Sequence, residues 1–169
     1  LMKTKLLFLL FLASLSSFAQ FTLIPDVNFE KKLIALGIDI DGLNGKVQTS
    51  RINTYNSLDV SGSGIKSLIG IEDFVALTNL YCSLNQLTVL DISKNTALSN
   101  LWCDSNQLTA LDISKNTALR MLYCDSNQLE ALDLSTNTVL YTLHCSSNQL
   151  KSLDLSKNTP LYDLICSSN

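Results

Sequence analysis

The five cysteines are the residues of this sequence best suited to chemistry, because thiols form disulfides, ligate metals and act as nucleophiles. They recur at a constant interval of 21 residues, as Cys82, Cys103, Cys124, Cys145 and Cys166. Five is an odd number, and the sequence lacks the C-x-x-C pairs and clustered histidines that are typical of metal sites. Three hypotheses follow from this spacing: a disulfide framework, a metal site, or thiols that belong to a repeated core.

Motifs of catalysis are missing from the sequence. It contains no G-x-S-x-G, no H-E-x-x-H and no glycine-rich phosphate loop, and His144 is the only histidine. The stretch "DIDGLNGKV" does not fit a calcium loop, because its acidic residues and glycine are out of register and the closing glutamate is missing. We therefore predict that the chain is not an enzyme and uses no metal or cofactor.

An internal repeat explains the cysteine spacing. Aligned on the cysteines, successive units read "LTNLYCSLNQLTVLDISKNTA", "LSNLWCDSNQLTALDISKNTA", "LRMLYCDSNQLEALDLSTNTV" and "LYTLHCSSNQLKSLDLSKNTP", followed by the half-unit "LYDLICSSN". The first half of each unit matches L-x-x-L-x-L-x-x-N-x-L, with cysteine in the third leucine position. The second half repeats the same spacing, so each unit consists of two nested segments of about ten residues.

These units resemble the 21-residue nested leucine-rich repeats of internalin-like surface proteins that bacteria secrete. The resemblance covers residues 77–169 closely. It implies a leucine-rich repeat solenoid, a short N-terminal helical cap, and a role in binding at the cell surface.

The alternation of apolar residues predicts the same architecture on physical grounds. In "LWC" and "LDIS", alternate apolar residues indicate short strands, with Leu101 and Cys103 inward on one side of the coil and Leu111 and Ile113 inward on the other. Coils stacked at about 4.8 Å would pair each strand with its copy in the next coil. We therefore expect parallel strands, with both sides of the coil extended.

Within such a stack, the cysteines take positions that the pattern assigns to buried leucines. Equivalent side chains on stacked strands point in parallel, so their Cβ atoms lie about 4.8 Å apart, whereas a disulfide needs about 3.8 Å. We therefore expect five unpaired core thiols. A disulfide framework and a metal site remain the alternatives.

Asparagine, and not glycine, is predicted to form the turns of the repeat. All six glycines precede residue 71. An inward asparagine can bond the N–H and C=O groups of a turning backbone, and it tolerates the left-handed conformation. We expect one ladder of such residues beside the cysteines and a second on the other side of the coil. The first consists of Asn85, Asn106, Asn127, Asn148 and Asn169, and the second of Asn95, Asn116, Asn137 and Asn158.

The N-terminal residues 1–19 are predicted to be a signal peptide, with cleavage after Ala19. Lys3 and Lys5 precede an apolar run that is too short for a comfortable membrane span, although an uncleaved anchor remains the alternative. The chain after Ala19 has 10 basic and 15 acidic residues, a net charge of −5, which argues against a nucleic-acid partner. We expect a secreted or cell-surface protein without a further transmembrane segment.

Residues 20–56 are expected to form a helical cap and a connecting turn. The stretch "IPDVNFEKKLIALGI" predicts a helix with Asp26 as N-cap, an apolar face of Phe29, Leu33 and Leu36, and Gly37 as its C-terminal stop. Residues 57–76 fit a degenerate first repeat, in which "GIEDFVAL" predicts a helical turn. Residues 77–169 comprise four and a half repeats. Because the last unit ends half-way, we expect the sequence to be a C-terminally truncated part of a longer chain.

The outward positions of the first strand form the candidate binding face. Its central column is Tyr81, Trp102, Tyr123, His144 and Ile165; one flank is Ser83, Asp104, Asp125, Ser146 and Ser167, and the other is Asn79, Asn100, Met121, Thr142 and Asp163. Aromatic rings beside carboxylates suit a sugar chain or a peptide's basic and apolar groups. Alternatively, the aromatics only stabilise the strand face.

The predicted function is a non-catalytic, adhesin-like module that binds an extracellular protein or carbohydrate. The expected ligand-binding residues are Tyr81, Trp102, Tyr123, His144, Asp104 and Asp125. The alternative is a structural spacer that projects another domain of a longer secreted protein. On the opposite side, an aspartate column beside lysines is expected to be structural.

Overall fold

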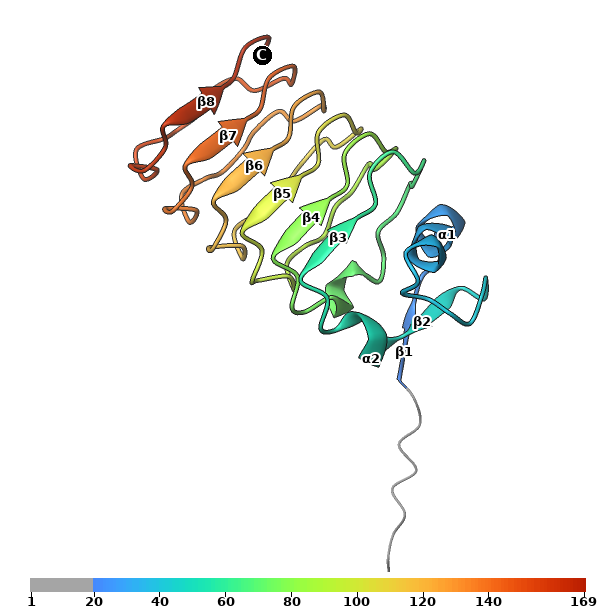
Figure 1. Ribbon diagram of the computed structural model, residues 1–169. Coiled ribbons are helices and arrows are strands. Elements are labelled where there is room, and N and C mark those ends of the chain that lie inside the picture. The colour runs from blue at the N-terminus through green and yellow to red at the C-terminus, as the bar shows by residue number, and fades with distance from the viewer. Residues whose placement is uncertain (1–19) are drawn as a thin grey trace, which may run out of the picture.

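The computed structural model of the protein describes residues 20–169, which form a short N-terminal cap and a stack of coils (Figure 1). The predicted signal peptide, residues 1–19, lies outside the described residues. The cap covers one end of the stack, and residue 169 lies at the opposite end.

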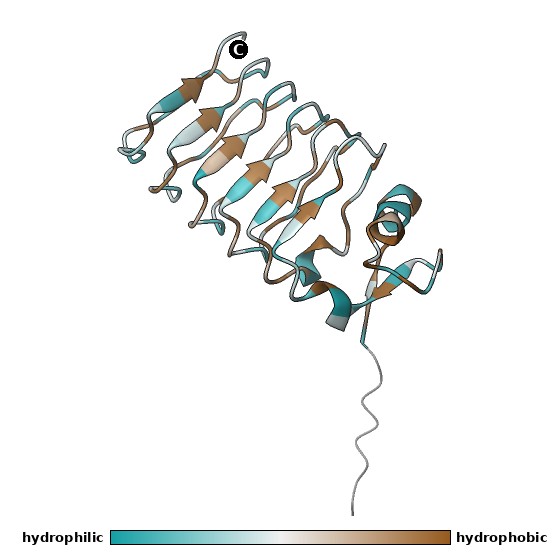
Figure 2. Cartoon of the chain, in the orientation of Figure 1, coloured by the Kyte–Doolittle hydropathy of each residue, from teal (hydrophilic) through white to brown (hydrophobic). Residues whose placement is uncertain are grey.

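One six-stranded parallel sheet runs along the whole stack. Its strands pair in chain order and in register, one from each coil. They are β3 (Ser57–Asp59), β4 (Asn79–Tyr81), β5 (Asn100–Trp102), β6 (Met121–Tyr123), β7 (Thr142–His144) and β8 (Asp163–Ile165). Figure 2 shows an apolar residue in the same place on successive strands, which is the inward leucine of each repeat. The predicted leucine-rich repeat solenoid is confirmed.

The expected strand pairing on the second side of the coil was wrong. Strands form on one side only among the described residues, and the "LDIS" segments have none. There the backbone N–H groups close local turns instead: Ser93 N donates to Asp91 Oδ1 at 3.0 Å, and Asn95 N to the Ile92 carbonyl at 3.0 Å. An N–H that closes a turn within its own coil cannot pair with the next coil.

Asparagine side chains join each coil to the one before it. Asn127 Nδ2 donates to the carbonyls of Cys124, in its own coil, and of Cys103, in the preceding coil, at 3.1 and 3.0 Å. Its Oδ1 accepts from Leu108 N at 3.0 Å. In the second ladder, Asn116 Nδ2 donates to the Ile92 and Asn95 carbonyls. Both ladders therefore satisfy buried backbone carbonyls across the boundary between coils. The expectation that the second ladder also accepts from backbone N–H groups was wrong, because its Oδ1 atoms are buried without a partner.

The left-handed conformation belongs to the residue before each asparagine of the first ladder, and not to the asparagine as expected. These residues are Leu84, Ser105, Ser126, Ser147 and Ser168, with φ between 53° and 59°. The asparagine side chain can reach carbonyls of two coils because the preceding residue makes the sharp turn.

The cap helix α1 (Val27–Ala35) begins and ends at the predicted residues. Asp26 Oδ1 accepts from Asn28 N and Phe29 N, and Gly37, with φ 70°, follows the last turn. Ile38 N donates to the Leu33 carbonyl, which completes a Schellman motif. Leu36, expected on the buried face, is 44% exposed; the buried residue that follows the helix is Ile38. The chain reverses at Gly37 and turns Ile38 under the helix.

Asp26 also ties the cap to the first coil. Its Oδ2 accepts from Lys66 N at 2.8 Å and Ser67 N at 3.0 Å. Burial acts to raise the pKa of this carboxyl, but the hydrogen bonds from four backbone N–H groups outweigh it and lower the pKa below the usual value. One side chain therefore caps α1 and fixes its position on the stack.

A small two-stranded antiparallel sheet in the cap was not expected from the sequence. Strand β1 (Phe21–Leu23) pairs with β2 (Lys46–Gln48), which leads into the short helix α2 (Thr49–Ile52). The predicted helical turn of the degenerate first repeat is the 3₁₀ helix η1 (Ile71–Asp73), and it follows Gly70. Thr22 Oγ1 donates to Asp73 Oδ2 at 2.5 Å, so this small sheet packs on the 3₁₀ turn.

The close approach of β1 to Gly70 gives the first prediction. A Cβ at Gly70 would lie 2.6 Å from the Leu23 carbonyl oxygen and 2.4 Å from Ile24 Cδ1, and its φ of 103° already disfavours a side chain. We expect Gly70→Ala to lower the free energy of unfolding by about 2–4 kcal/mol, since both backbone strain and displacement of β1 are involved. Chemical denaturation measures this change.

Gly62 is the matched control. It also has a positive φ, 61°, but a Cβ there meets no atom within 4 Å. Gly62→Ala should therefore cost about 1 kcal/mol, from backbone strain alone. Equal losses for the two variants would contradict the packing of β1 on Gly70.

Candidate binding face

Four aromatic side chains form a continuous ladder on the outer face of the sheet. Tyr81, Trp102, Tyr123 and His144 occupy equivalent positions on β4 to β7. The Tyr81 and Trp102 rings stack with centroids 4.3 Å apart, and those of Trp102 and Tyr123 with centroids 5.3 Å apart, at interplanar angles of 14° and 8°. His144 meets Tyr123 edge-to-face at 4.5 Å. All four side chains are half-buried.

This stacking determines which part of each ring a partner can reach. The faces of Trp102 are covered by Tyr81 on one side and by Tyr123 on the other. The ring edges and the polar atoms on them, the tyrosine hydroxyls and the indole N–H, remain for solvent or a partner. A sugar ring has no free face of Trp102 on which to lie.

Two carboxylates follow the ladder along one flank. Asp104 accepts a hydrogen bond from the Ser83 hydroxyl of the preceding coil, and Asp125 Oδ1 accepts from Ser146 N at 2.8 Å. Ser146 and Ser167 continue this flank, with their hydroxyl oxygens 3.2 Å apart. Because each carboxylate is bonded to a neighbouring coil, its orientation beside the rings is fixed.

The other flank changes its character along the stack. Asn100 Nδ2 donates to Asn79 Oδ1 at 2.6 Å, but Asn100 Oδ1 is buried and has no partner, because Met121 follows. Thr142, which was expected among the outward residues of this flank, is 2% exposed. Asp163 Oδ2 lies 3.2 Å from His144 Nε2. Ile165, the last residue of the central column, is exposed.

Sequence reasoning missed a second aromatic pair beside this face. Tyr141 and Tyr162 stack at 5.6 Å with an interplanar angle of 6°. Burial, then the charge of Asp163 and the nearness of these two tyrosines, raise the pKa of Tyr123, so its hydroxyl keeps its proton. The sequence did indicate this pair: both tyrosines directly follow the first leucine of a repeat, so they occupy equivalent positions on successive coils.

The cysteine column lies behind the sheet, in the core. Cys82, Cys103, Cys124 and Cys145 are fully buried, and Cys166 of the last coil is exposed; none is in a disulfide. Burial, the largest cause, raises the pKa of all four buried thiols, that of Cys145 to about 11. These thiols stay protonated and act as small apolar side chains.

The comparisons with known proteins agree with this geometry. No family model matches the sequence. Internalin J of Listeria monocytogenes is 40% identical over 72 residues, which make up 43% of this chain and 8% of internalin J. The structure of the functional domain of InlJ from Listeria monocytogenes, which includes a cysteine ladder, superposes with a TM-score of 0.80 at 38% identity, over 88% of this chain and 33% of that one. The chain is a leucine-rich repeat solenoid that is similar to internalins of Listeria monocytogenes.

Two further internalin structures from Listeria monocytogenes support the fold alone. InlF matches with a TM-score of 0.65 at 23% identity, over 83% of this chain and 49% of that one. Internalin C2 matches with a TM-score of 0.61 at 22% identity, over 86% and 77%. The internalin-like chain spans 8% of internalin J and about a third of the InlJ domain.

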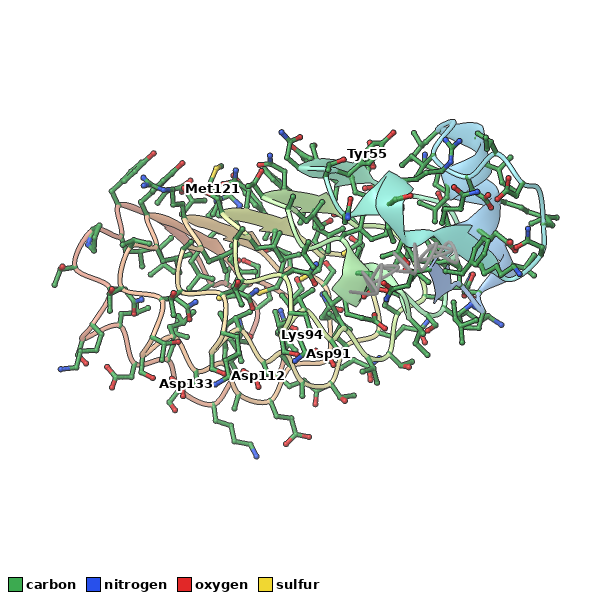
Figure 3. The ribbon with its side chains drawn as sticks, turned by 90° about the horizontal axis from the view of Figure 1, so that it is seen from below. Tyr55, Asp91, Lys94, Asp112, Met121 and Asp133 are labelled. Carbon is green, nitrogen blue, oxygen red and sulfur yellow. The ribbon has the colours of Figure 1, made fainter. Side chains whose placement is uncertain are left out.

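The opposite side of the internalin-like solenoid has a regular pattern of aspartates and lysines. Figure 3 shows Asp91, Asp112 and Asp133 on the side of the coil away from Met121. Each aspartate accepts from the backbone N–H of the serine two residues later, and this bond is the main reason why their pKa values lie below the usual value. A groove of about 560 Å³ lies at one end of this side, lined by Lys66, Ile69 and Val89 among others.

The "DIDGLNGKV" stretch is a polar turn held by the cap helix. The buried Glu30 carboxylate accepts from Asn44 N at 2.7 Å and Gly45 N at 2.6 Å. Within residues 20–169, no group of three or more histidine, cysteine or acidic side chains is placed to hold a metal ion.

The buried thiols give the second prediction. Protein of residues 20–169, denatured without reductant, should titrate close to five free thiols with Ellman's reagent. In the native protein one thiol, Cys166, should react fast and the other four slowly, because burial excludes the reagent and raises their pKa. Recovery of a single thiol on denaturation would mean two disulfides and would overturn the unpaired column.

Substitution of one buried thiol tests its apolar role. Cys124→Ser should lower the free energy of unfolding by about 1–3 kcal/mol, since the hydroxyl would have no partner there. Cys124→Val should cost less. A serine variant as stable as the parent protein would argue against a dry cysteine column.

Proposed function

We propose that this internalin-like region is a non-catalytic binding module of a secreted or cell-surface protein. The module recognises an extracellular protein or carbohydrate, as an adhesin does, through the outer face of β4 to β7. The observation that supports this most is the in-register ladder of Tyr81, Trp102 and Tyr123, half-buried and flanked by Asp104 and Asp125. Large aromatic side chains on an outer face, beside fixed polar groups, are typical of binding hot spots.

The ladder is compact, and its size sets the expected affinity. Three rungs span about 10 Å at ~4.8 Å per strand. Such a site holds two sugar units or a few peptide residues, so a single contact is weak and many copies on a surface bind by avidity. The similarity to internalin J and the predicted signal peptide support a place outside the cell. Among the described residues, no helix is long and apolar enough to span a membrane.

A structural spacer is the second candidate function, and the ring stacking favours it. The rings contact one another over their faces, and each stacked pair contributes about 0.5–1.5 kcal/mol beyond its buried area. If the ladder serves only to stiffen the sheet, the stack projects another domain of a longer protein and needs no ligand.

Replacement of Trp102 separates the two functions and gives the third prediction. Trp102→Ala should weaken binding of any glycan or protein that the parent binds on an array by at least tenfold, a loss of about 1.4 kcal/mol. It should also lower stability by about 1–3 kcal/mol, because two stacked contacts are lost. Biolayer interferometry and thermal unfolding measure the two effects.

Two variants serve as controls. Trp102→Phe retains an aromatic ring in the stack, so it should keep most of the stability. Val89→Ala truncates a side chain that is 72% exposed on the opposite side of the coil, and it should leave both binding and stability unchanged. If Trp102→Ala binds as tightly as the parent protein, the ladder only packs the strand face, and the spacer becomes the preferred function of this face.

A further inference from the structure

We propose that the partner of the aromatic face is a basic segment of a polypeptide, with lysine or arginine side chains, and not a glycan. This inference rests on the proposed function of the face as a binding site. It adds the chemical class of the partner, and it follows from the ring stacking and from the distribution of charge around the ladder.

The stacking disfavours carbohydrate. Proteins bind sugars by laying the apolar face of a sugar ring on an open aromatic face. Trp102 is stacked on both sides, and Tyr123 lies between Trp102 and the edge of the His144 ring. The outer face of Tyr81 borders Asp59, its in-register neighbour on β3. What the ladder offers is a strip of ring edges with hydroxyl and N–H groups, which suits aliphatic stems and peptide carbonyls.

Carboxylates surround this strip on three sides. Asp59 stands at the first end of the ladder, Asp163 at the last, and Asp104 and Asp125 along one flank. Arg120, the residue before β6, is the only lysine or arginine next to these columns, so the face and its border hold four acidic groups and one basic group. The formal charge of these five groups is 1 − 4 = −3.

The four carboxylates are held in place before a partner arrives. Asp59 Oδ1 accepts from Ser61 N at 3.0 Å, and Asp125 Oδ1 from Ser146 N at 2.8 Å. Asp104 is bonded to the Ser83 hydroxyl, and Asp163 lies against His144. Ordering flexible acidic side chains costs binding energy, and here this cost is largely met in the free protein. Fixed carboxylates are suited to lysine and arginine heads.

The opposite side of the coil provides the contrast. Its aspartates are equally regular, but lysines lie among them: Asp91, Asp112, Asp133 and Asp154 stand beside Lys94, Lys115 and Lys157. Glu130 and Lys151 on the same side lie 3.9 Å apart and cancel each other. The aromatic face therefore combines apolar surface with uncompensated negative charge, whereas the opposite side does not.

The test uses protein of residues 20–169 and two kinds of probe. One is an array of random twelve-residue peptides of defined net charge, and the other an array of neutral and acidic oligosaccharides. We expect binding to peptides enriched in lysine and arginine. For the tightest peptide, fluorescence anisotropy at 50 mM NaCl should show the Asp104→Asn, Asp125→Asn double variant binding five- to twentyfold more weakly than the parent protein.

The matched control changes the same charge on the other side. Asp112→Asn with Asp133→Asn also removes two exposed carboxylates that stand one coil apart, and it should change the affinity less than twofold. The difference between the two double variants should shrink at 500 mM NaCl, because the Debye length falls to about 4 Å. Asparagine keeps the acceptor oxygens that bond the neighbouring serines, so the fold should be unaffected.

Each remaining outcome has one meaning. The protein could instead bind an oligosaccharide. If Trp102→Ala abolishes this binding, while salt and the Asp104→Asn, Asp125→Asn double variant leave it unchanged, the basic-peptide partner is overturned and the proposed function is retained. Equal losses for the two double variants would show that net charge alone attracts the peptide, which also overturns the inference. Binding that no variant of the aromatic face alters would overturn both proposals.

Discussion

Stacking of successive coils in a fixed register, with a spacing of 21 residues from β4 to β8, is the constraint on which this structure depends. Asparagine side chains enforce it. Asn127 donates to carbonyls of two neighbouring coils and accepts the N–H of Leu108, so a shift of one residue would leave these buried groups without partners. Short strands of three residues suffice for the sheet because the turns are fixed by side chains. The stack is stable as a sum of interfaces between coils.

The same constraint separates structure from function. Inward positions repeat leucine, cysteine and asparagine because every coil meets an identical neighbour, whereas outward positions can vary without disturbing the core. For example, the second full repeat has Asp104 where the preceding repeat has Ser83, and this difference changes the surface of one coil only. Repetition also brings equivalent outward side chains about 4.8 Å apart. Tyr81, Trp102 and Tyr123 therefore stack, which turns three separate side chains into one continuous surface.

The sequence predicted those features that depend on period and burial. Leucine spacing gave the solenoid and the inward direction of Cys103, and Asp26 with Gly37 gave the ends of α1. Features that depend on competition between hydrogen bonds were missed: Ser93 N bonds Asp91 and so prevents a second sheet. The β1–β2 sheet pairs residues 23 to 27 positions apart in a non-repeating segment, where no period exists to reveal it. The sequence placed the rings in one column, but it could not tell whether their faces stack or stay free.

Amide hydrogen exchange at Leu108, followed by NMR, tests the asparagine constraint most directly. Leu108 N–H lies outside every strand, and its acceptor is the Asn127 side chain at 3.0 Å. Its exchange should be as slow as that of Cys103 N–H, which donates to the Tyr123 carbonyl next to the sheet. In Asn127→Ala, Leu108 should exchange far faster, while amides two or more coils away, such as that of Leu80, keep their protection. Exchange at Leu108 as fast as at the exposed Thr109, in the parent protein, would contradict the proposed role of the asparagine ladder.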